Sequence, residues 1–93
     1  MLFLISLEYT QPLEEVGRHL EGHRVFLENH FQAGHFLLSG PKQPRTGGMI
    51  LVRAETREEV MQWITEDPFH EQGVATFEVV GWEPSMSAPE IAL

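Results

Sequence analysis

The order of the apolar segments constrains the fold of this chain more than any other feature of its sequence. Short apolar runs that are typical of strands alternate with longer segments in which apolar residues recur every three or four positions, as on one face of a helix. Strands are predicted at residues 2–9, 35–40, 49–54 and 74–82. One helical segment lies between the first two strands and another between the last two. The predicted order is therefore strand, helix, strand, strand, helix, strand.

The first helical segment begins near Gln11-Pro12, because proline is favoured at the first turn of a helix. Its apolar stripe consists of Val16, Leu20, His23, Phe26, Leu27, His30 and Phe31. Gly34 is well placed to end this helix. Gly17 and Gly22 each weaken a helix by up to about 1 kcal/mol relative to alanine. We therefore expect its first half to be irregular.

The second helical segment begins at a local signal, since Thr56 and Glu59 have the spacing of a capping box. Its apolar side consists of Val60, Trp63 and Ile64. The helix must end before Pro68, because the residue that precedes a proline is disfavoured in the helical conformation. Residues 65–74, TEDPFHEQGV, then connect this helix to the last strand.

Together these elements predict an α+β fold of the ferredoxin-like type, a split β-α-β-β-α-β sandwich. Residues 42–48, KQPRTGG, form the hairpin loop between the middle strands. Four antiparallel strands would carry both helices on one face, with the strands at 2–9 and 49–54 in the centre of the sheet. These two strands lack the alternating polar residues of a solvated face. We therefore expect a second subunit to cover the open face, in a homodimer that joins sheet to sheet.

The composition limits the class of protein. The chain has 93 residues, enough for one domain, which we place at residues 1–82, with a tail at 83–93. Its net charge of −8 argues against nucleic acid and anionic membranes as partners. It contains no cysteine, no apolar run long enough to span a bilayer and no pattern of a signal peptide. A cytoplasmic location is the default expectation.

His23 is the first candidate for chemistry. It lies on the apolar stripe between Leu20 and Leu27, where a purely structural design would place another leucine. Asp67 could accept a hydrogen bond from one ring nitrogen and leave the other free for the proton of a substrate. The alternative is a core histidine that is satisfied by a backbone carbonyl. His30, on the same stripe, is a weaker candidate.

Other motifs favour simpler interpretations. His19 and His23 are four residues apart, a spacing that can bind a metal. No third ligand is evident, so we expect no metal site. The TGGM sequence at 46–49 resembles a phosphate-binding loop, yet it lies between two strands and is better explained as a hairpin turn. Ser39 is a strand residue that faces a pocket. His70 is either part of the rim of a pocket or an exposed loop residue.

Two stretches of the sequence, HRVFLENHFQAGHFLLSGP and EDPFHEQGV, resemble the YciI-like (YCII-related) family. The shared features are the helix residue His23, the run from Gly34 to Gly40-Pro41, the element Asp67-Pro68-Phe69, and Gly73. The resemblance extends from residue 1 to about residue 82. Each motif is weak alone, but their order and spacing are specific together.

The resemblance implies a dimeric ferredoxin-like fold, an assembly of the dimeric α-β barrel type, with a pocket that holds a His-Asp pair. On this chain the pair falls on His23 and Asp67. Pro68 would turn the carboxylate inward, and Phe69 would form an apolar wall. The family is regarded as one of enzymes, with proton-transfer chemistry such as elimination from halogenated aromatics proposed in one branch.

We therefore expect a small enzyme without a metal or organic cofactor, of the lyase or hydrolase type. His23 would be its general acid/base and Asp67 the orienting partner. The substrate would be a small molecule, such as a cyclic or aromatic one, in contact with Ser39, Gly40, Pro41 and Phe69. One alternative is a non-catalytic dimer that binds a small molecule or has a regulatory role. Another is an oxygenase-like relative on the same fold.

Overall fold

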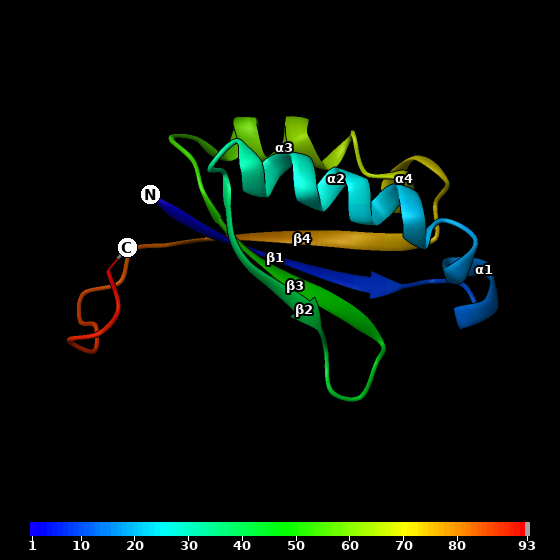
Figure 1. Ribbon diagram of the computed structural model, residues 1–93, viewed down its shortest axis with the longest axis horizontal. Coiled ribbons are helices and arrows are strands. Elements are labelled where there is room, and N and C mark those ends of the chain that lie inside the picture. The colour runs from blue at the N-terminus through cyan, green and yellow to red at the C-terminus, as the bar shows by residue number, and fades with distance from the viewer. Residues whose placement is uncertain (93) are drawn as a thin grey trace.

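The computed structural model describes residues 1–92 and consists of one sheet with helices over one of its faces (Figure 1). Its strands are β1 (Leu2–Tyr9), β2 (Phe36–Pro41), β3 (Gly47–Arg53) and β4 (Ala75–Trp82). Its helices are α1 (Leu13–Gly17), α2 (Leu20–Gln32), α3 (Arg57–Ile64) and α4 (Pro68–Glu71). The four predicted strands are present, the first predicted helical segment is divided into α1 and α2, and α4 is an element that the sequence analysis does not predict.

The sheet has the strand order β2-β3-β1-β4, and every neighbouring pair is antiparallel. The strands expected in the centre of the sheet, β1 and β3, are the central ones. The longer helices α2 and α3 lie over the same face of the sheet (Figure 1). This arrangement confirms a four-stranded antiparallel α+β fold and agrees with the ferredoxin-like order of elements.

The core lies between the helices and the sheet. Alternate residues of β1, namely Phe3, Ile5 and Leu7, are at most 3% exposed and face the helices. Across the sheet, Val52 and Ile50 of β3 pair with Phe3 and Ile5. The helices contribute Val16, Phe26, Val60, Ile64 and Phe69. Each such buried side chain contributes about 1.5–3 kcal/mol relative to an exposed one, so the core fixes the helices on this face.

The two glycines of the first helical segment have different roles. The helix is interrupted directly after Gly17, the last residue of α1, as the expected irregularity would require. Gly22 lies inside α2, where its missing side chain makes room for a neighbour. A Cβ atom at Gly22 would lie 2.9 Å from Cγ of Pro68, the first residue of α4. Gly22 therefore allows close contact between α2 and α4 and does not disrupt the helix.

The predicted hairpin loop is two residues too long. Gly47 and Gly48 belong to β3, where they pair with Glu8 and Leu7 of β1. A Cβ atom at Gly47 would lie 1.9 Å from the carbonyl oxygen of Leu7. The position thus requires glycine because the two central strands approach closely, a tertiary cause that the local sequence does not reveal.

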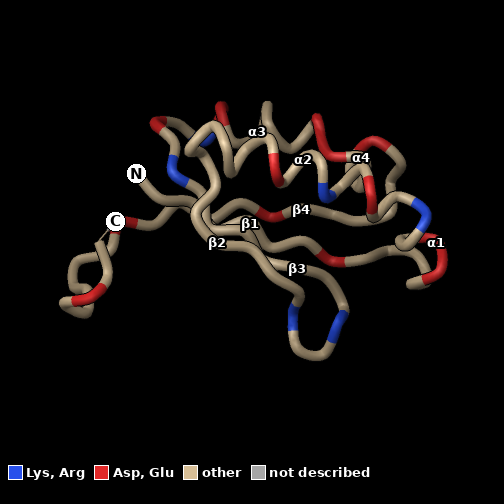
Figure 2. Tube along the Cα trace, in the orientation of Figure 1, with Lys and Arg blue, Asp and Glu red and all other residues tan. Residues whose placement is uncertain are grey.

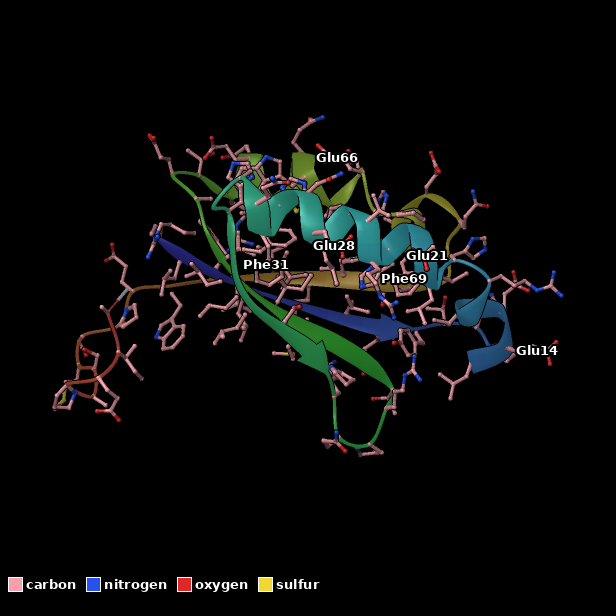
Figure 3. The ribbon with its side chains drawn as sticks, viewed as in Figure 1. Glu14, Glu21, Glu28, Phe31, Glu66 and Phe69 are labelled. Atoms are coloured by element: carbon pink, nitrogen blue, oxygen red, sulfur yellow. The ribbon has the colours of Figure 1, made fainter. Side chains whose placement is uncertain are left out.

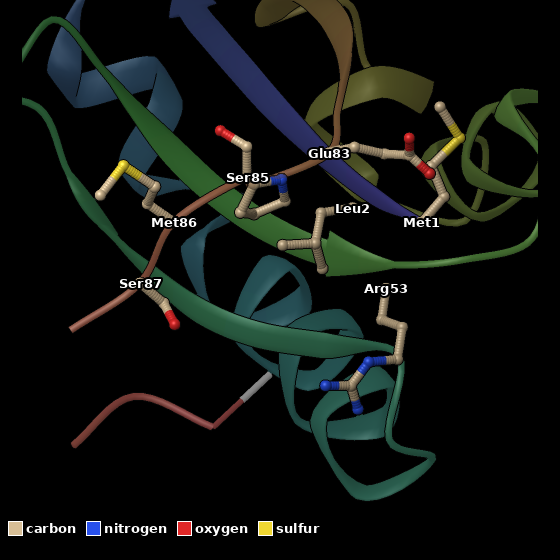
Figure 4. A pocket seen from close by; sticks show the side chains of 8 residues that line it. Met1, Leu2, Arg53, Glu83, Ser85, Met86 and Ser87 are labelled. Atoms are coloured by element: carbon tan, nitrogen blue, oxygen red, sulfur yellow. The ribbon is translucent and has the colours of Figure 1, made fainter. Parts of the chain in front are cut away.

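The face of the sheet opposite the helices exposes large apolar side chains. Leu38, Val80 and Trp82 are 67%, 46% and 49% exposed. The chain continues from β4 into residues 83–92, which extend away from the sheet (Figure 1). This segment forms a cavity of about 490 Å³ with Leu2 and Arg53 (Figure 4). No helix within residues 1–92 is long and apolar enough to cross a lipid bilayer.

Candidate functional site

Asp67 is the residue at which α4 begins. Its backbone is extended, with φ −79° and ψ 123°, and its carboxylate accepts a hydrogen bond from the backbone N–H of Phe69 at 3.0 Å. Pro68 occupies the first turn of α4, where its fixed φ angle favours the helix and its missing N–H costs nothing. The join that the sequence suggests as a simple connection is therefore a short capped helix. Its cap turns the Asp67 carboxylate into the protein, where it is fully buried.

The Asp67 carboxylate meets the imidazole of His23 on α2. Nδ1 of His23 lies 2.9 Å from Oδ1 and 3.0 Å from Oδ2 of Asp67, although the residues are 44 positions apart. The close packing of Gly22 against Pro68 brings the two helices near enough for this contact. The His23 side chain is 12% exposed. The contact is therefore largely shielded from water on the Asp67 side and reaches the surface on the His23 side.

The hydrogen bonds of the carboxylate assign the imidazole tautomer. An ionised carboxylate can only accept hydrogen bonds, so the Nδ1 of His23 must be the donor. In the neutral ring, Nε2 then has a lone pair and no hydrogen. With its N–H donors from Phe69 and His23, the buried charge of Asp67 has the partners that burial of a charge requires. The arrangement can present a basic nitrogen at a fixed position.

Phe69 supports the imidazole of His23 by stacking on the face of its ring. The rings of Phe69 and His23 stack with their centroids 4.0 Å apart and an interplanar angle of 5°. Phe69 is only 1% exposed, and it lies between α2 and the sheet (Figure 3). The rings of Tyr9 and Phe69 are perpendicular to each other, and their centroids are 6.0 Å apart. Phe69 is not among the residues that line the cavity beside His23, so its expected role as an apolar wall stays a prediction, while its ring supports the face of the imidazole.

A cavity of about 420 Å³ lies beside His23, between α2 and the hairpin that connects β2 and β3. We call it the His23 cavity. Ser39, Gly40 and Pro41, which the sequence suggests as contacts of a substrate, all contribute to its lining. Its other lining residues are Leu7, Tyr9, Leu20, Arg24, Leu27, Arg45, Gly47, Gly48, Met49 and Ile50. The structure thus brings the end of β2 to the histidine of α2.

Three polar residues of this cavity are absent from the sequence-based candidates. Tyr9 ends β1, Arg24 follows His23 on α2, and Arg45 lies in the hairpin. Tyr9 looks like an ordinary strand residue in the sequence, and Arg45 like an ordinary loop residue. Arg24 could have been identified from the sequence only by its position next to His23. Arg45 of the hairpin and residues of α2 line the same cavity, and this proximity is a property of the tertiary fold.

His30, the weaker candidate, belongs to a second cluster. Its Nε2 lies 2.7 Å from Oε1 of Glu66, and its Nδ1 lies 2.9 Å from Nδ1 of His35. His35 stacks on Trp63 with the ring centroids 4.0 Å apart. His30 is 6% exposed and does not line the His23 cavity. Sequence reasoning did not find its partners, because Trp63 and Glu66 lie at or just after the end of the distant α3 and His35 lies in the turn before β2.

The remaining histidines lie away from the His23 cavity. His70 contributes to another cavity, between α3 and β4, so it is not the rim residue of the predicted pocket. Nε2 of His19, at the start of α2, lies 3.6 Å from Oε2 of Glu15 in α1. Within residues 1–92, no group of three or more histidine, cysteine, aspartate or glutamate side chains is arranged to hold a metal ion.

The chain is similar to proteins of known structure along most of its length. One of them is 5-chloro-2-hydroxyhydroquinone dehydrochlorinase from Burkholderia phenoliruptrix, in complex with 2,5-dihydroxybenzoquinone. The two chains are 25% identical and superimpose with a TM-score of 0.77, over 89% of this chain and 94% of the other. None of the curated proteins compared with the chain matches it.

The family assignment rests on a match of almost the whole domain. The model of the YCII-related domain matches residues 1–83, which include every element of the sheet, both long helices and the contact between α2 and α4. The chain therefore belongs to the family of the YCII-related domain.

Proposed function

We propose that this protein is an enzyme that transfers a proton to or from a small molecule, with His23 as general acid/base and Asp67 as its orienting partner. The observation that carries the proposal is the pairing of Nδ1 of His23 with the buried Asp67 carboxylate at the wall of a cavity. That pairing leaves Nε2 as the nitrogen that a ligand in the cavity can reach. A histidine with a fixed tautomer beside a ligand site has the geometry that general acid/base catalysis requires.

The chemistry that best suits this site is an elimination or isomerisation of a small cyclic molecule. Nε2 of His23 would take a proton from the substrate, and the carboxylate of Asp67 would stabilise the imidazolium that forms. In a dehydrohalogenation, the electrons of the broken bond to hydrogen form the new double bond, and halide leaves with the electrons of the carbon–halogen bond. Such a proton transfer needs no organic cofactor. The similarity to a dehydrochlorinase supports this reaction class.

Replacement of His23 tests the proposal. We expect His23→Asn to lower chloride release from 5-chloro-2-hydroxyhydroquinone by about 10²–10⁴-fold, the usual contribution of a positioned general acid/base. The Kd for the same compound should change only a few-fold, because the cavity is otherwise intact. His70→Asn, at an exposed residue of another cavity, is the matched control.

Two results would contradict the proposal. The first is a His23→Asn variant that turns over the compound as fast as the wild type. The second is a wild-type protein that binds the compound without ever consuming it, which would favour a ligand-binding protein over an enzyme.

We also propose that the protein forms a homodimer through the open face of the sheet. Leu38, Val80 and Trp82 expose large apolar surfaces there, and exposed apolar patches of this kind mark interaction sites. The same face carries Arg53 at one end of the central strands and Glu8 at the other. A two-fold axis in the plane of the interface and perpendicular to these strands would place the opposite charges near one another, which would make the face self-complementary.

A further inference from the structure

The charge of the His23 cavity is the opposite of the charge of the whole chain. Acidic residues outnumber basic ones by 14 to 6 in the sequence. The lining of the cavity nevertheless contains two arginines, Arg24 and Arg45, and no aspartate or glutamate. Asp67 is adjacent but is buried behind His23 and does not contribute to the lining. Basic positions on α2 and on the β2–β3 hairpin are visible in Figure 2.

Both arginines are available to a ligand. Within the described part of the chain, the lysine and arginine side chains that form ion pairs are Arg18, with Glu15, and Lys42, with Glu8. Lys42 and Arg45 belong to the same hairpin. Lys42 forms an ion pair with Glu8 of β1, and within residues 1–92 Arg45 does not belong to an ion pair. A guanidinium presents several N–H donors in a plane and suits a bidentate contact with an oxyanion.

The other lining residues indicate what kind of molecule fits the cavity. Leucine and isoleucine side chains from β1, α2 and β3 form an apolar floor: Leu7, Leu20, Leu27 and Ile50. Tyr9 and Ser39 add hydroxyl groups. A volume of about 420 Å³ accommodates a single ring with a few substituents. The cavity therefore combines an apolar surface of ring size with two cations.

We infer that the His23 cavity selects a small cyclic anion, with Arg24 and Arg45 binding its charged oxygen and the apolar floor binding its ring. The inference rests on the proposed function, because it names the substrate class of that same site. Two cations offset the repulsion that a chain of net charge −8 exerts on an anion. They also stabilise negative charge that develops on a substrate oxygen when His23 removes a proton. The anionic group is an oxyanion, from a carboxylate or from an ionised ring hydroxyl.

The test compares anions with neutral molecules of the same shape. Benzoate and benzamide form one pair, and 4-nitrophenolate and 4-nitroaniline form the other, each titrated by NMR at low ionic strength. We expect at least one anion to bind about tenfold or more tightly than its neutral counterpart, as charge-assisted hydrogen bonds require. Arg24→Gln and Arg45→Gln should each reduce this preference, and the double variant should abolish it. The pair that shows the preference identifies the carboxylate or the ring oxyanion as the preferred group.

Arg18→Gln is the matched control, since it removes the same charge from a residue that is paired with Glu15 outside the cavity. It should leave the preference for anions unchanged. Equal binding of anions and neutral molecules, no binding of either anion at millimolar concentration, or an equal loss in Arg18→Gln would overturn the inference. The titration is repeated with His23→Asn. If the preference persists there while the proposed turnover is never observed, the proposed function fails and the anion site stands.

Discussion

At the scale of single residues, the site depends on one carboxylate that has two partners. Asp67 caps α4 through the N–H of Phe69 and binds Nδ1 of His23 with the same group. Aspartate suits both tasks because its short side chain is among the best helix N-caps. The opening of α4 and the orientation of the imidazole are therefore coupled through a single side chain.

Phe69 provides a prediction at this scale, because it stacks on His23 and does not line the cavity. We expect Phe69→Leu to lower kcat for chloride release at least several-fold and to leave KM nearly unchanged, since the imidazole loses its flat support. The smaller side chain should also destabilise the core by about 1–3 kcal/mol, measured by urea unfolding. Ser39→Ala, which alters the lining itself, is the comparison. A large rise in KM in Phe69→Leu would show that this ring contacts the substrate.

The residues of the site were predictable to different degrees. His23 stands out in the sequence because it interrupts an apolar stripe, and Asp67 because it follows a helix in an unusual element. Arg24 and Arg45 resemble ordinary surface residues, since an exposed arginine carries no sign of the surface it faces. The stacking of Phe69 on His23 was not predicted, because it depends on the contact between α2 and α4 and not on a local pattern.

At the scale of the elements, the contact between α2 and α4 positions His23 and Asp67, the proposed catalytic pair. Gly22 of α2 and Pro68 of α4 pack closely, and the histidine and the carboxylate are each adjacent to one of these residues. A small change in the separation of the two helices therefore changes the distance between His23 and Asp67.

Gly22→Ala tests this dependence. The added Cβ would lie 2.9 Å from Cγ of Pro68, so one element must shift, while alanine favours the helix by up to about 1 kcal/mol. We expect kcat to fall by more than tenfold, with a change in unfolding free energy of about 1 kcal/mol or less because the two effects oppose each other. Gly17→Ala is the control, since nothing lies within 4 Å of its added Cβ. Equal activity of the two variants would mean that the spacing of the helices does not control the site.

Local signals predicted the elements well, and tertiary contacts account for some of the differences. The capping box of Thr56 and Glu59 is present at the start of α3, because its hydrogen bonds involve only neighbouring residues. The break after Gly17 likewise follows from local propensity. The inclusion of Gly47 in β3 depends on the close approach of β1, which the sequence pattern does not contain. The helix α4 does have local signals, its aspartate cap and Pro68, but the sequence analysis interpreted Pro68 only as the end of the preceding helix.

At the scale of the whole molecule, the two faces of the sheet have different tasks. One face carries the helices, the core and the His23 cavity, and the other presents an apolar surface. The apolar character of β1 on both faces is visible in the sequence and led to the expectation of a homodimer. In a single chain, the helices cover one apolar face of the sheet and leave the other exposed. The dimer therefore remains a prediction, and it has a specific test.

Val80→Glu is that test, measured by light scattering on a size-exclusion column. Val80 lies on the open face and is 46% exposed, and a carboxylate there would be buried without a partner in the interface. We expect the wild type to be a dimer and Val80→Glu a folded monomer. Val25→Glu is the matched control, because Val25 is also 46% exposed but lies on α2. A monomeric wild type, or a Val80→Glu variant that stays dimeric, would argue against this interface.

The central claim is that Asp67 holds the His23 ring with hydrogen on Nδ1, so that Nε2 is available for proton transfer. Long-range proton–nitrogen NMR of the imidazole side chains measures this tautomer directly. In the neutral ring of the wild-type protein, we predict a protonated Nδ1 and an unprotonated Nε2 on His23. In Asp67→Asn this preference should weaken or reverse, because the amide can donate to the ring nitrogen. A His23 that has its hydrogen on Nε2 in the wild type, or a tautomer that is the same in both proteins, would contradict the account.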